Sequence, residues 1–477
     1  MSGTAIAAVG AYAPRFRISA EAFEEAWGQF QAAGVSEKAV PAADEDALTM
    51  GYEAATRALA AADLAGTEIS WLGFATSTPP LEEEDLAVRL GAMLALSEDA
   101  TRQVFTGSTR AGTRALWAGM DAVASAGGNG LVVAADAPRG EPDDAIDHAA
   151  GAGAAAFVLA RDGPGKIVDR AEYAAPYPGT RFRGHGDETT DGLGITGYDR
   201  QAFTETIGGA VDGLETAPDP DVAAIQAPDG KLPYRAAGAA GVGTDEIQAC
   251  ATIHDLGDLG AASVPVSLAR ALADGVDSIL AVSNGSGAGA DAFVVDAADD
   301  VPAAIALDGG DALSYAEYLR QRGVVTSGPP SGGGAYVSVP TWRRSIPQRY
   351  RLVAGRCHEC DALAFPPEGA CSECGTLAGY ETVELPGDGT IEAVTTISQG
   401  GAPPEFAEGQ AQSGDYAAAI VALDADDASE AVSIPAMGTD ADPGAFAVGD
   451  RIETTIRRIY TQEGVTRYGF KVRPAAD

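Results

Sequence analysis

One arrangement of elements occurs twice in the chain and constrains its fold more than any other feature. In each copy, a helix of small residues leads to an apolar strand, a Gly/Ala turn and a second strand. Residues 151–158 and 287–294 share the pattern Gly-Ala-Gly-Ala-x-Ala-Phe-Val. Because the flanking elements also come in the same order, duplication of an α/β unit explains the match better than chance similarity in an Ala/Gly-rich chain.

The duplication divides the first part of the chain into two halves, residues 1–165 and 166–342. The chain has 477 residues, which is too many for one ordinary core. The apolar start at Ala5–Gly10 has no basic region before it, so we expect a first strand there and not a signal peptide. The other elements expected in the two halves are helices at 46–61, 112–125 and 263–273 and strands at 131–136 and 279–284.

Four of the five cysteines form two Cys-x2-Cys pairs separated by ten residues. They are Cys357, Cys360, Cys371 and Cys374. Two such pairs on tight turns make a closed tetrahedral site of four thiolates, which leaves no position for a catalytic water. The spacing therefore predicts a structural zinc ribbon over residues 343–378, and not a catalytic zinc or a redox dithiol. Gly375 suits the positive φ angle of such a turn, and His358 is expected to be a bystander.

Short alternating runs separated by Gly and Asp turns follow the cysteines and predict a small antiparallel β-barrel, OB-like, over residues 379–477. The runs lie at 380–385, 390–397, 416–423, 431–435, 451–460 and 465–472. A glycine-rich loop at 327–334 precedes this region and lacks the lysine of a phosphate-binding loop. Such a barrel can also be a nucleic-acid module, but the acidic chain shows no stripe of aromatic and basic residues.

The net charge of −38, with few lysines, bounds the environment and the partners. Nucleic-acid binding needs a basic surface, so this function is disfavoured. The acids are spread along the whole chain, which is typical of a solvated surface in a halophilic archaeon, where concentrated salt screens charges over a few ångströms. No run of 18 apolar residues occurs, so we expect no membrane span and a cytoplasmic protein.

Several motifs in the first 340 residues resemble the thiolase superfamily, and in particular archaeal hydroxymethylglutaryl-CoA (HMG-CoA) synthase. The motifs are Asp-Glu-Asp-Ala-Leu-Thr-Met at 44–50, Arg-Ala-Gly-Thr at 110–113, Pro-Asp-Gly-Lys at 228–231 and Ser-Asn-Gly-Ser-Gly-Ala-Gly at 283–289. The last 130 residues resemble the zinc-ribbon/OB-fold scaffold protein that accompanies archaeal thiolases, here fused to the first part. The resemblance implies a duplicated, layered αβαβα thiolase-like fold.

The resemblance also implies where catalytic residues would lie, and all four positions have changed. The family's nucleophilic Cys corresponds to Thr109, and its His to Gln226. Its Glu corresponds to Thr76, and its Asn, which follows a Gly, to Asp258. A Thr hydroxyl is far less acidic than a thiol, and Gln cannot accept the proton that a base must take.

Other residues could supply the missing chemistry. Ser108 is a second hydroxyl beside the nucleophile position, and His185 lies in a loop that could approach a cleft. His148 and His254 lie elsewhere, and none of these histidines occupies the family position. Cys250 is expected on a strand, as a core residue and not as a displaced nucleophile.

Coenzyme A carries phosphates, so a strongly acidic protein needs local cations and backbone donors to bind it. Lys231 and Arg110 are the candidate cations, with Arg114 nearby. Gly285 and Gly287 are candidates for a close approach of the backbone to the cavity, although tight turns alone can require them.

Two hypotheses about function follow from these observations. In the first, the protein is a catalytically degenerate scaffold or partner subunit of a thiolase-type acyl-CoA condensing complex. In the second, it is an active acyl-CoA acyltransferase that uses a Ser or Thr hydroxyl in place of Cys. The resemblance implies a homodimer, a complex with an acetyl-CoA acetyltransferase (thiolase), or both, with structural zinc and CoA or acyl-CoA as ligands.

Overall fold

The computed structural model describes residues 4–297, 300–326, 339–398, 404–425, 430–462 and 464–475, so the glycine-rich loop at 327–334 lies outside the described residues. The chain forms two compact units. Unit 1 comprises Met1–Pro41 and Asp46–Tyr318, and unit 2 comprises Ala42–Glu45 and Leu319–Asp477. The finer division at residues 165, 342 and 378 stays a prediction.

A ten-stranded sheet forms the framework of unit 1, in the order β5-β4-β6-β7-β1-β8-β11-β10-β9, with β12 beside β1. The strands are β1 (Ala5–Tyr12), β4 (Ile69–Ala75), β5 (Thr101–Phe105), β6 (Asn129–Asp136), β7 (Gly153–Ala160), β8 (Gly165–Tyr173), β9 (Val222–Ile225), β10 (Ser278–Asn284), β11 (Ala290–Asp296) and β12 (Ala303–Ala306). Both halves combine parallel and antiparallel pairs: β4 is parallel to β6 and β9 to β10, whereas β6–β7 and β10–β11 pair antiparallel.

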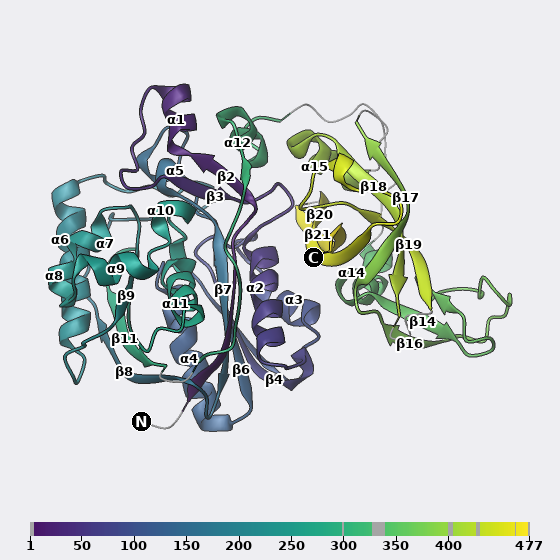
Figure 1. Ribbon diagram of the computed structural model, residues 1–477, viewed down its shortest axis with the longest axis horizontal. Helices are drawn as coiled ribbons and strands as arrows, with labels where there is room; N and C mark the ends of the chain where they lie inside the picture. Colours follow the sequence, from purple (N-terminus) through teal and green to yellow (C-terminus); the bar gives the residue numbers. More distant parts are fainter. Residues whose placement is uncertain are drawn as a thin grey trace. The chain divides into compact units, whose positions relative to one another are not determined.

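Helices cover the sheet of unit 1 in three layers (Figure 1). Helices α2 (Ala47–Ala61) and α3 (Leu86–Met93) lie on one side, α4 (Ala111–Ala126) and α11 (Ser263–Ala273) in the middle, and α6 (Thr196–Asp212) on the other side. Strand alternation explains the layers. On β10, Ile279 and Ala281 join the core of the middle helices, whereas Leu280 and Val282 pack with α6. This is the predicted thiolase-like arrangement.

The two copies of the duplicated unit differ in one connection. In the second copy, β10 and β11 form a hairpin closed by the predicted Gly/Ala turn. In the first copy, residues 137–152, including α5 (Ala145–Ala149), separate β6 from β7, although the two strands still pair antiparallel. The prediction of a Gly/Ala turn that directly joins the two strands of the first copy is therefore wrong, because the longer segment joins them and Gly153 already begins β7.

The predicted helix at 46–61 is α2, and its start is fixed by a capping box. The Asp46 side chain accepts hydrogen bonds from Leu48 N and Thr49 N, while the Thr49 side chain accepts one from Asp46 N. The acidic residue thus lies at the positive end of the helix dipole.

The remaining elements of unit 1 are short. A three-stranded sheet has the order β13-β2-β3. These elements are β2 (Phe16–Ser19), β3 (Glu37–Val40), β13 (Asp311–Ala312), α1 (Ala20–Trp27), α7 (Leu232–Arg235), α8 (Ala237–Ala240), α9 (Thr244–Cys250) and α10 (Ile253–Leu256). The boundary between the units falls within α12 (Tyr315–Gln321). Among the described residues, no helix is long and apolar enough to cross a membrane.

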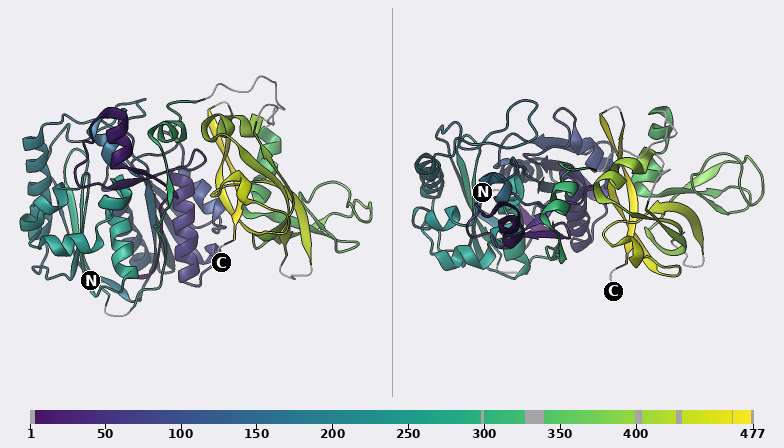
Figure 2. Two further views of the ribbon diagram at one scale, coloured as in Figure 1. Left: turned by 45° about the horizontal axis from the view of Figure 1, so that its top comes forward. Right: turned by 90° about the horizontal axis from the view of Figure 1, so that it is seen from above.

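Unit 2 contains a small ribbon sheet and a five-stranded antiparallel barrel-like sheet, and the ribbon projects from the barrel (Figure 2). The ribbon strands are β14 (Val353–Cys357), β15 (Leu363–Ala364) and β16 (Tyr380–Glu384), and the barrel strands are β17 (Asp388–Ile397), β18 (Tyr416–Asp424), β19 (Ala431–Met437), β20 (Arg451–Gln462) and β21 (Val465–Pro474). Three short helices accompany them, α13 (Val339–Arg344), α14 (Ile346–Arg351) and α15 (Pro404–Ser413). The run at 380–385 was expected in the barrel but pairs with β14 in the ribbon.

The barrel order is β19-β18-β17-β20-β21, and a bridge between Gly438 and Val472 nearly closes it. Alternate residues of its strands fill one core, including Val421, Ile434 and Ile452. The barrel predicted from the alternating pattern is therefore present.

Candidate functional site

The four cysteines of the ribbon come together at two tight turns. The Sγ atoms of Cys357 and Cys374 are 3.8 Å apart, those of Cys360 and Cys371 are 3.6 Å apart, and all four lie within 4.8 Å of one another. A tetrahedral zinc with Zn–S bonds of about 2.3 Å requires S···S distances of about 3.8 Å. The four thiols therefore fit a zinc ion with no vacant coordination position.

The backbone of both turns is shaped for this arrangement. Gly375 has φ +71° and donates its N–H to the Cys371 carbonyl oxygen. In the first turn Asp361 has φ +60° and bonds to Cys357 in the same way, a role that the spacing did not reveal. His358 lies outside the group of four ligands.

Three of the four positions that the resemblance matches to catalytic residues meet around the main chain of Gly260 and Ala261. Gln226 Nε2 donates to Gly260 O at 2.9 Å, and Asp258 Oδ1 accepts from Gly260 N at 2.9 Å. Thr76 Oγ1 donates to Asp136 at 3.1 Å, and Asp136 in turn accepts from Ala261 N at 2.7 Å. These contacts form one buried group, which we call the Gly260 cluster: Thr76, Asp136, Gln226, Asp258, Gly260 and Ala261.

The fourth position, Thr109, lies two residues before α4, and the first turn of this helix touches the Gly260 cluster. A Cβ atom on Gly112 would lie 2.4 Å from Ala261 O, so only glycine permits the approach. The Thr109 side chain is buried, and its hydroxyl donates to the Asn284 carbonyl oxygen at 2.6 Å. A carbonyl oxygen holds the hydroxyl proton without accepting it, so this contact does not create an alkoxide nucleophile.

The histidines form their contacts elsewhere in the described residues. The buried His148 accepts a hydrogen bond from Gln31 N at 2.9 Å, and His254 contacts Tyr234 and Gly34. The His185 side chain is 91% exposed and pairs with Glu82. The expectation that His185 could serve a cleft therefore finds no support in its contacts.

Cys250 ends helix α9, so its predicted position on a strand is wrong; the segment Thr244–Cys250 packs as a helix against β9. The side chain is buried, as expected for a core residue. Burial raises the pKa of the Cys250 thiol to about 12, which keeps the sulfur protonated and a poor nucleophile at neutral pH.

Arg110 is occupied by carboxylates. Its guanidinium donates to Asp291 at 3.0 Å through Nε and to Glu172 at 3.0 Å through Nη2, and Arg114 also pairs with Glu172. Burial alone lowers the pKa of Arg110, but the hydrogen bonds and charges of Asp291 and Glu172 outweigh burial and raise it. A phosphate group would have to compete with two carboxylates, so Arg110 is a weaker candidate than its position implied.

The other three predicted binding residues have distinct local roles. Lys231 is exposed just before α7, and its N–H donates to Asp229 at 2.7 Å. Gly285 permits a close approach, because a Cβ there would lie 2.5 Å from Arg110 Cδ and 2.7 Å from Ser108 Oγ. Gly287 has open space around it but φ +77°, so the turn itself requires glycine.

Two residues of the site were missed by sequence reasoning. Asp136 is fully buried and accepts hydrogen bonds from Thr76, Ser77, Thr78 and Ala261. Its place at the end of an apolar strand was the available signal. Arg181, from the long loop after β8, pairs with Asp258 at 2.5 Å, and only the fold brings these residues together.

The Gly260 cluster and Arg181, which pairs with its Asp258, leave two polar atoms available. Gln226 Oε1 is buried and accepts no hydrogen bond from the described residues, and Arg181 Nη2 donates none to them. A buried polar atom without a partner costs about 1–3 kcal/mol, so an acceptor and a donor in one cluster favour a bound polar group. The arrangement can therefore hold a small polar ligand.

Comparison with known proteins finds relatives for two parts of the chain. Residues 344–378 match the ChsH2 rubredoxin-like zinc ribbon domain family. The hydroxymethylglutaryl-CoA synthase of Methanopyrus kandleri is 31% identical over 307 residues, covering 60% of this chain and 86% of the relative. The hydroxymethylglutaryl-CoA synthase of Pyrobaculum neutrophilum is 30% identical over 348 residues, covering 68% of this chain and 99% of the relative.

Solved structures share the fold. MvaS in complex with 3-hydroxy-3-methylglutaryl coenzyme A aligns with a TM-score of 0.58 and 18% identity, over 71% of this chain and 94% of that protein. The 3-oxoacyl-[acyl-carrier-protein] synthase III of Aquifex aeolicus aligns with a TM-score of 0.54 and 20% identity, over 62% of this chain and all of that protein. A thiolase-like fold, the extended match to archaeal relatives and the ribbon with four cysteines lead to one conclusion: the chain belongs to the hydroxymethylglutaryl-CoA synthase family and carries a zinc ribbon domain in its C-terminal part.

Proposed function

We propose that this protein is a catalytically degenerate member of its family that serves as a scaffold or partner subunit of a thiolase-type acyl-CoA condensing complex. The observation that carries the proposal is the state of Thr109, whose hydroxyl donates to the Asn284 carbonyl oxygen. The neighbouring Gln226 amide donates to Gly260 O and cannot act as a base. Covalent acyl transfer needs a nucleophile and a base together, and neither is present at these positions.

Retention of a CoA-type ligand is part of the proposal. Gln226 Oε1 and Arg181 Nη2 are available to a polar acyl group, and Lys231 offers an exposed ammonium to a phosphate. A structural neighbour with a TM-score of 0.58 is an HMG-CoA synthase complexed with CoA, which supports the same ligand class here. In this proposal the protein binds acyl-CoA and presents it or senses it, but forms no acyl-enzyme.

The assembly has a structural starting point in strand β5. This strand ends the ten-stranded sheet and, in the described part of the chain, pairs on one side only, with β4. An unpaired edge is available to a second copy or to a thiolase of the same fold. We therefore propose a homodimer, a complex with an acetyl-CoA acetyltransferase, or both, in the cytoplasm of a halophile.

Incubation with radiolabelled acetyl-CoA tests the loss of chemistry. The native protein and Thr109→Ala should both remain unlabelled after denaturation. The double variant Thr109→Cys with Gln226→His should acquire label, and it serves as the positive control that the assay detects an acyl-enzyme. A stable label on the native protein that Thr109→Ala or Ser108→Ala removes would establish the alternative, an active acyltransferase with a hydroxyl nucleophile.

Calorimetry tests the ligand. The native protein should bind acetyl-CoA, and Lys231→Ala should weaken binding by roughly threefold to tenfold, as expected for one charged contact to phosphate. Lys166→Ala is the matched control, because Lys166 is also an exposed lysine but lies on β8. Absence of binding would remove CoA from the proposal, and absence of co-elution with a thiolase from the same organism would remove the scaffold role.

A further inference from the structure

Unit 2 includes four residues that are distant in sequence from the rest of it. Ala42–Glu45 belongs to this unit together with Leu319–Asp477. The segment is a closed turn: Glu45 N donates to Ala42 O at 2.9 Å, and Glu45 Oε2 accepts from Ala42 N at 2.9 Å. It therefore presents two adjacent carboxylates, Asp44 and Glu45, on a preorganised loop.

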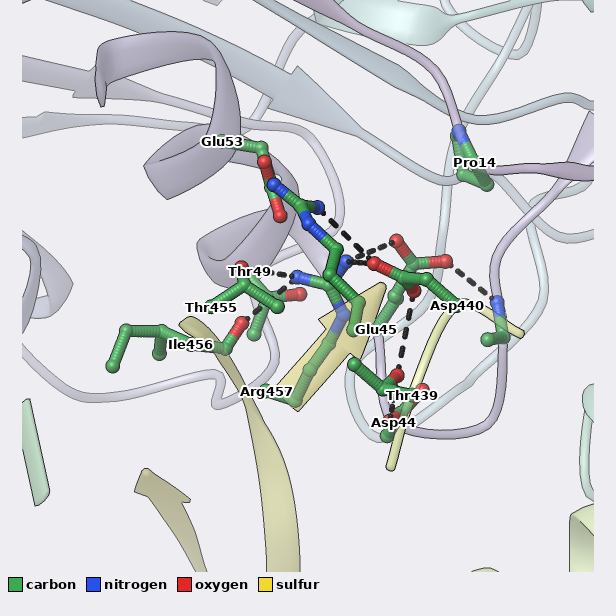
Figure 3. Close-up of polar contacts among 12 residues, drawn as sticks. Pro14, Asp44, Glu45, Thr49, Glu53, Thr439, Asp440, Thr455, Ile456 and Arg457 are labelled. Carbon is green, nitrogen blue, oxygen red and sulfur yellow. Dashed lines mark hydrogen bonds and ion pairs between the residues drawn. The ribbon is translucent and has the colours of Figure 1, made fainter. Parts of the chain in front are cut away.

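Buried cations of the barrel contact both carboxylates, and Figure 3 shows Arg457 beside Glu45 and Thr439 beside Asp44. Lys471 Nζ and Thr439 Oγ1 donate to Asp44 Oδ2 at 2.7 and 2.9 Å. Arg457 Nη2 lies 3.6 Å from Glu45 Oε1, and the side chains of this pair are 0% and 1% exposed. These pairs lie on strands β20 and β21, on the barrel and not on the ribbon.

The barrel supplies one carboxylate of its own to the same group. Asp440 Oδ2 accepts from Arg457 Nη2 at 2.7 Å and from Arg473 Nη1 at 3.1 Å. Three cations, Arg457, Lys471 and Arg473, thus face Asp440 and the two loop carboxylates. Without the loop, Lys471 would lose the Asp44 carboxylate, and Arg457 would lose the Glu45 carboxylate.

The loop also accepts a hydrogen bond from a main-chain N–H of the barrel. Strand β20 has an irregularity between Arg458 and Tyr460, and on its other side it pairs with β17 only at residues 451–453. At the bulge, Arg458 N donates to Asp44 O at 2.8 Å. Gln321 Oε1 accepts from Ala43 N at 2.9 Å, so side chains and backbone of the loop are both recognised.

We propose that the barrel carries a recognition site for an acidic loop, built from Arg457, Lys471, Thr439 and the β20 bulge, and that Ala42–Glu45 of the same chain is its occupant. The chemistry selects two neighbouring carboxylates on a tight turn. Removing one member of a buried ion pair leaves its partner as an uncompensated charge, so the site makes folding of β20 and β21 depend on the loop. This inference does not depend on the proposed function.

Hydrogen exchange of the full-length protein, read from peptides of β20 and β21, tests the site. Asp44→Asn and Lys471→Met should each accelerate exchange there by about tenfold or more, and the double variant should exchange little faster than either single variant. The matched control is Asp424→Asn with Arg451→Met, a more exposed ion pair in the same unit, for which we expect changes of about fivefold or less.

If Asp44→Asn fails to fold, a less disruptive variant and its control can be measured instead. Glu45→Gln should accelerate exchange in β20, whereas Glu384→Gln, whose partner Arg351 is partly exposed, should not. Equal effects of the buried and exposed substitutions would overturn the recognition site. Co-refolding of Asp44→Asn with Lys471→Met should restore nothing; restored protection would show that the loop comes from a second copy and would overturn the assignment of the occupant.

Discussion

Replacing Asp44 with Asn should destabilise unit 2 by an amount that depends on pH. Burial alone raises the pKa of the Asp44 carboxyl, but the charges of Lys471 and Arg457 and the hydrogen bonds from Lys471 and Thr439 outweigh burial and lower it from 3.8 to about 2. Such a carboxyl is ionised more readily in the folded than in the unfolded chain. Its stabilising contribution is therefore complete above the unfolded pKa and disappears as the pH falls through the folded pKa.

The size of the effect follows from the two pKa values of Asp44. A fall from 3.8 to about 2 corresponds to about 2.5 kcal/mol, because each pKa unit is worth about 1.36 kcal/mol. This contribution should be complete above about pH 5, should fall to about half at pH 3, and should vanish below pH 2. Asn keeps the shape of the side chain without its charge, so the stability difference between native protein and variant should follow this curve.

Urea unfolding at pH 7, 5, 4 and 3 measures the difference. Trp342 reports on unit 2, because its ring packs on Tyr460 with centroids 5.9 Å apart, and the three other tryptophans can be replaced by Phe. Asp424→Asn is the control, since a partly exposed pair contributes about 1 kcal/mol or less. A loss in Asp44→Asn that is the same at pH 7 and pH 3 would refute the electrostatic reasoning.

Three further predictions concern the metal, the free thiol and the sheet edge. Chelation of zinc, or Cys371→Ser, should unfold the ribbon and abolish binding of one zinc per chain, measured by elemental analysis and circular dichroism, while the Trp342 signal of the barrel persists. Cys250 should resist alkylation by iodoacetamide at pH 8 until the protein is unfolded, because its thiol is buried with a pKa of about 12; rapid alkylation of the folded protein would contradict this. Gln103→Lys should weaken a dimer formed through β5, measured by light scattering, because two copies of the exposed central residue of this strand would place like charges opposite each other; an unchanged dimer would place the interface elsewhere.

The parts of the molecule that depend on local spacing could be predicted from the sequence. The zinc ligands follow from Cys-x2-Cys pairs, and strand alternation predicts the barrel. Family motifs also single out Thr109 and Gln226. In the fold, Thr109 lies just before α4, and Gln226 lies in the Gly260 cluster, which the first turn of α4 contacts. Each of these features can be identified from residues that are close together in the sequence.

Features that depend on long-range packing could not be predicted. The pairing of Arg181 with Asp258 joins a loop to a turn 77 positions away. A motif marks Asp258, but no local pattern marks Arg181 as its partner. Cys250 was placed on a strand because Ala, Thr and Cys are compatible with both structures, and packing against β9 selects the helix. The sequence predicts a helix that begins at residue 46, and only the structure shows that Asp46 caps this helix while Asp44 and Glu45 belong to unit 2.

The composition of unit 2 from two distant segments has a consequence for the order of events during synthesis. Lys471 is made 427 positions after Asp44, so at about 5–20 residues per second the loop waits roughly 20 to 90 s for its partner. During this time the thiolase-like unit can fold, whereas the barrel cannot complete its ionic contacts until β21 has left the ribosome. Until then the carboxylates of the loop are solvated by water, which costs little in a chain this acidic, and β21 later supplies their cationic partner.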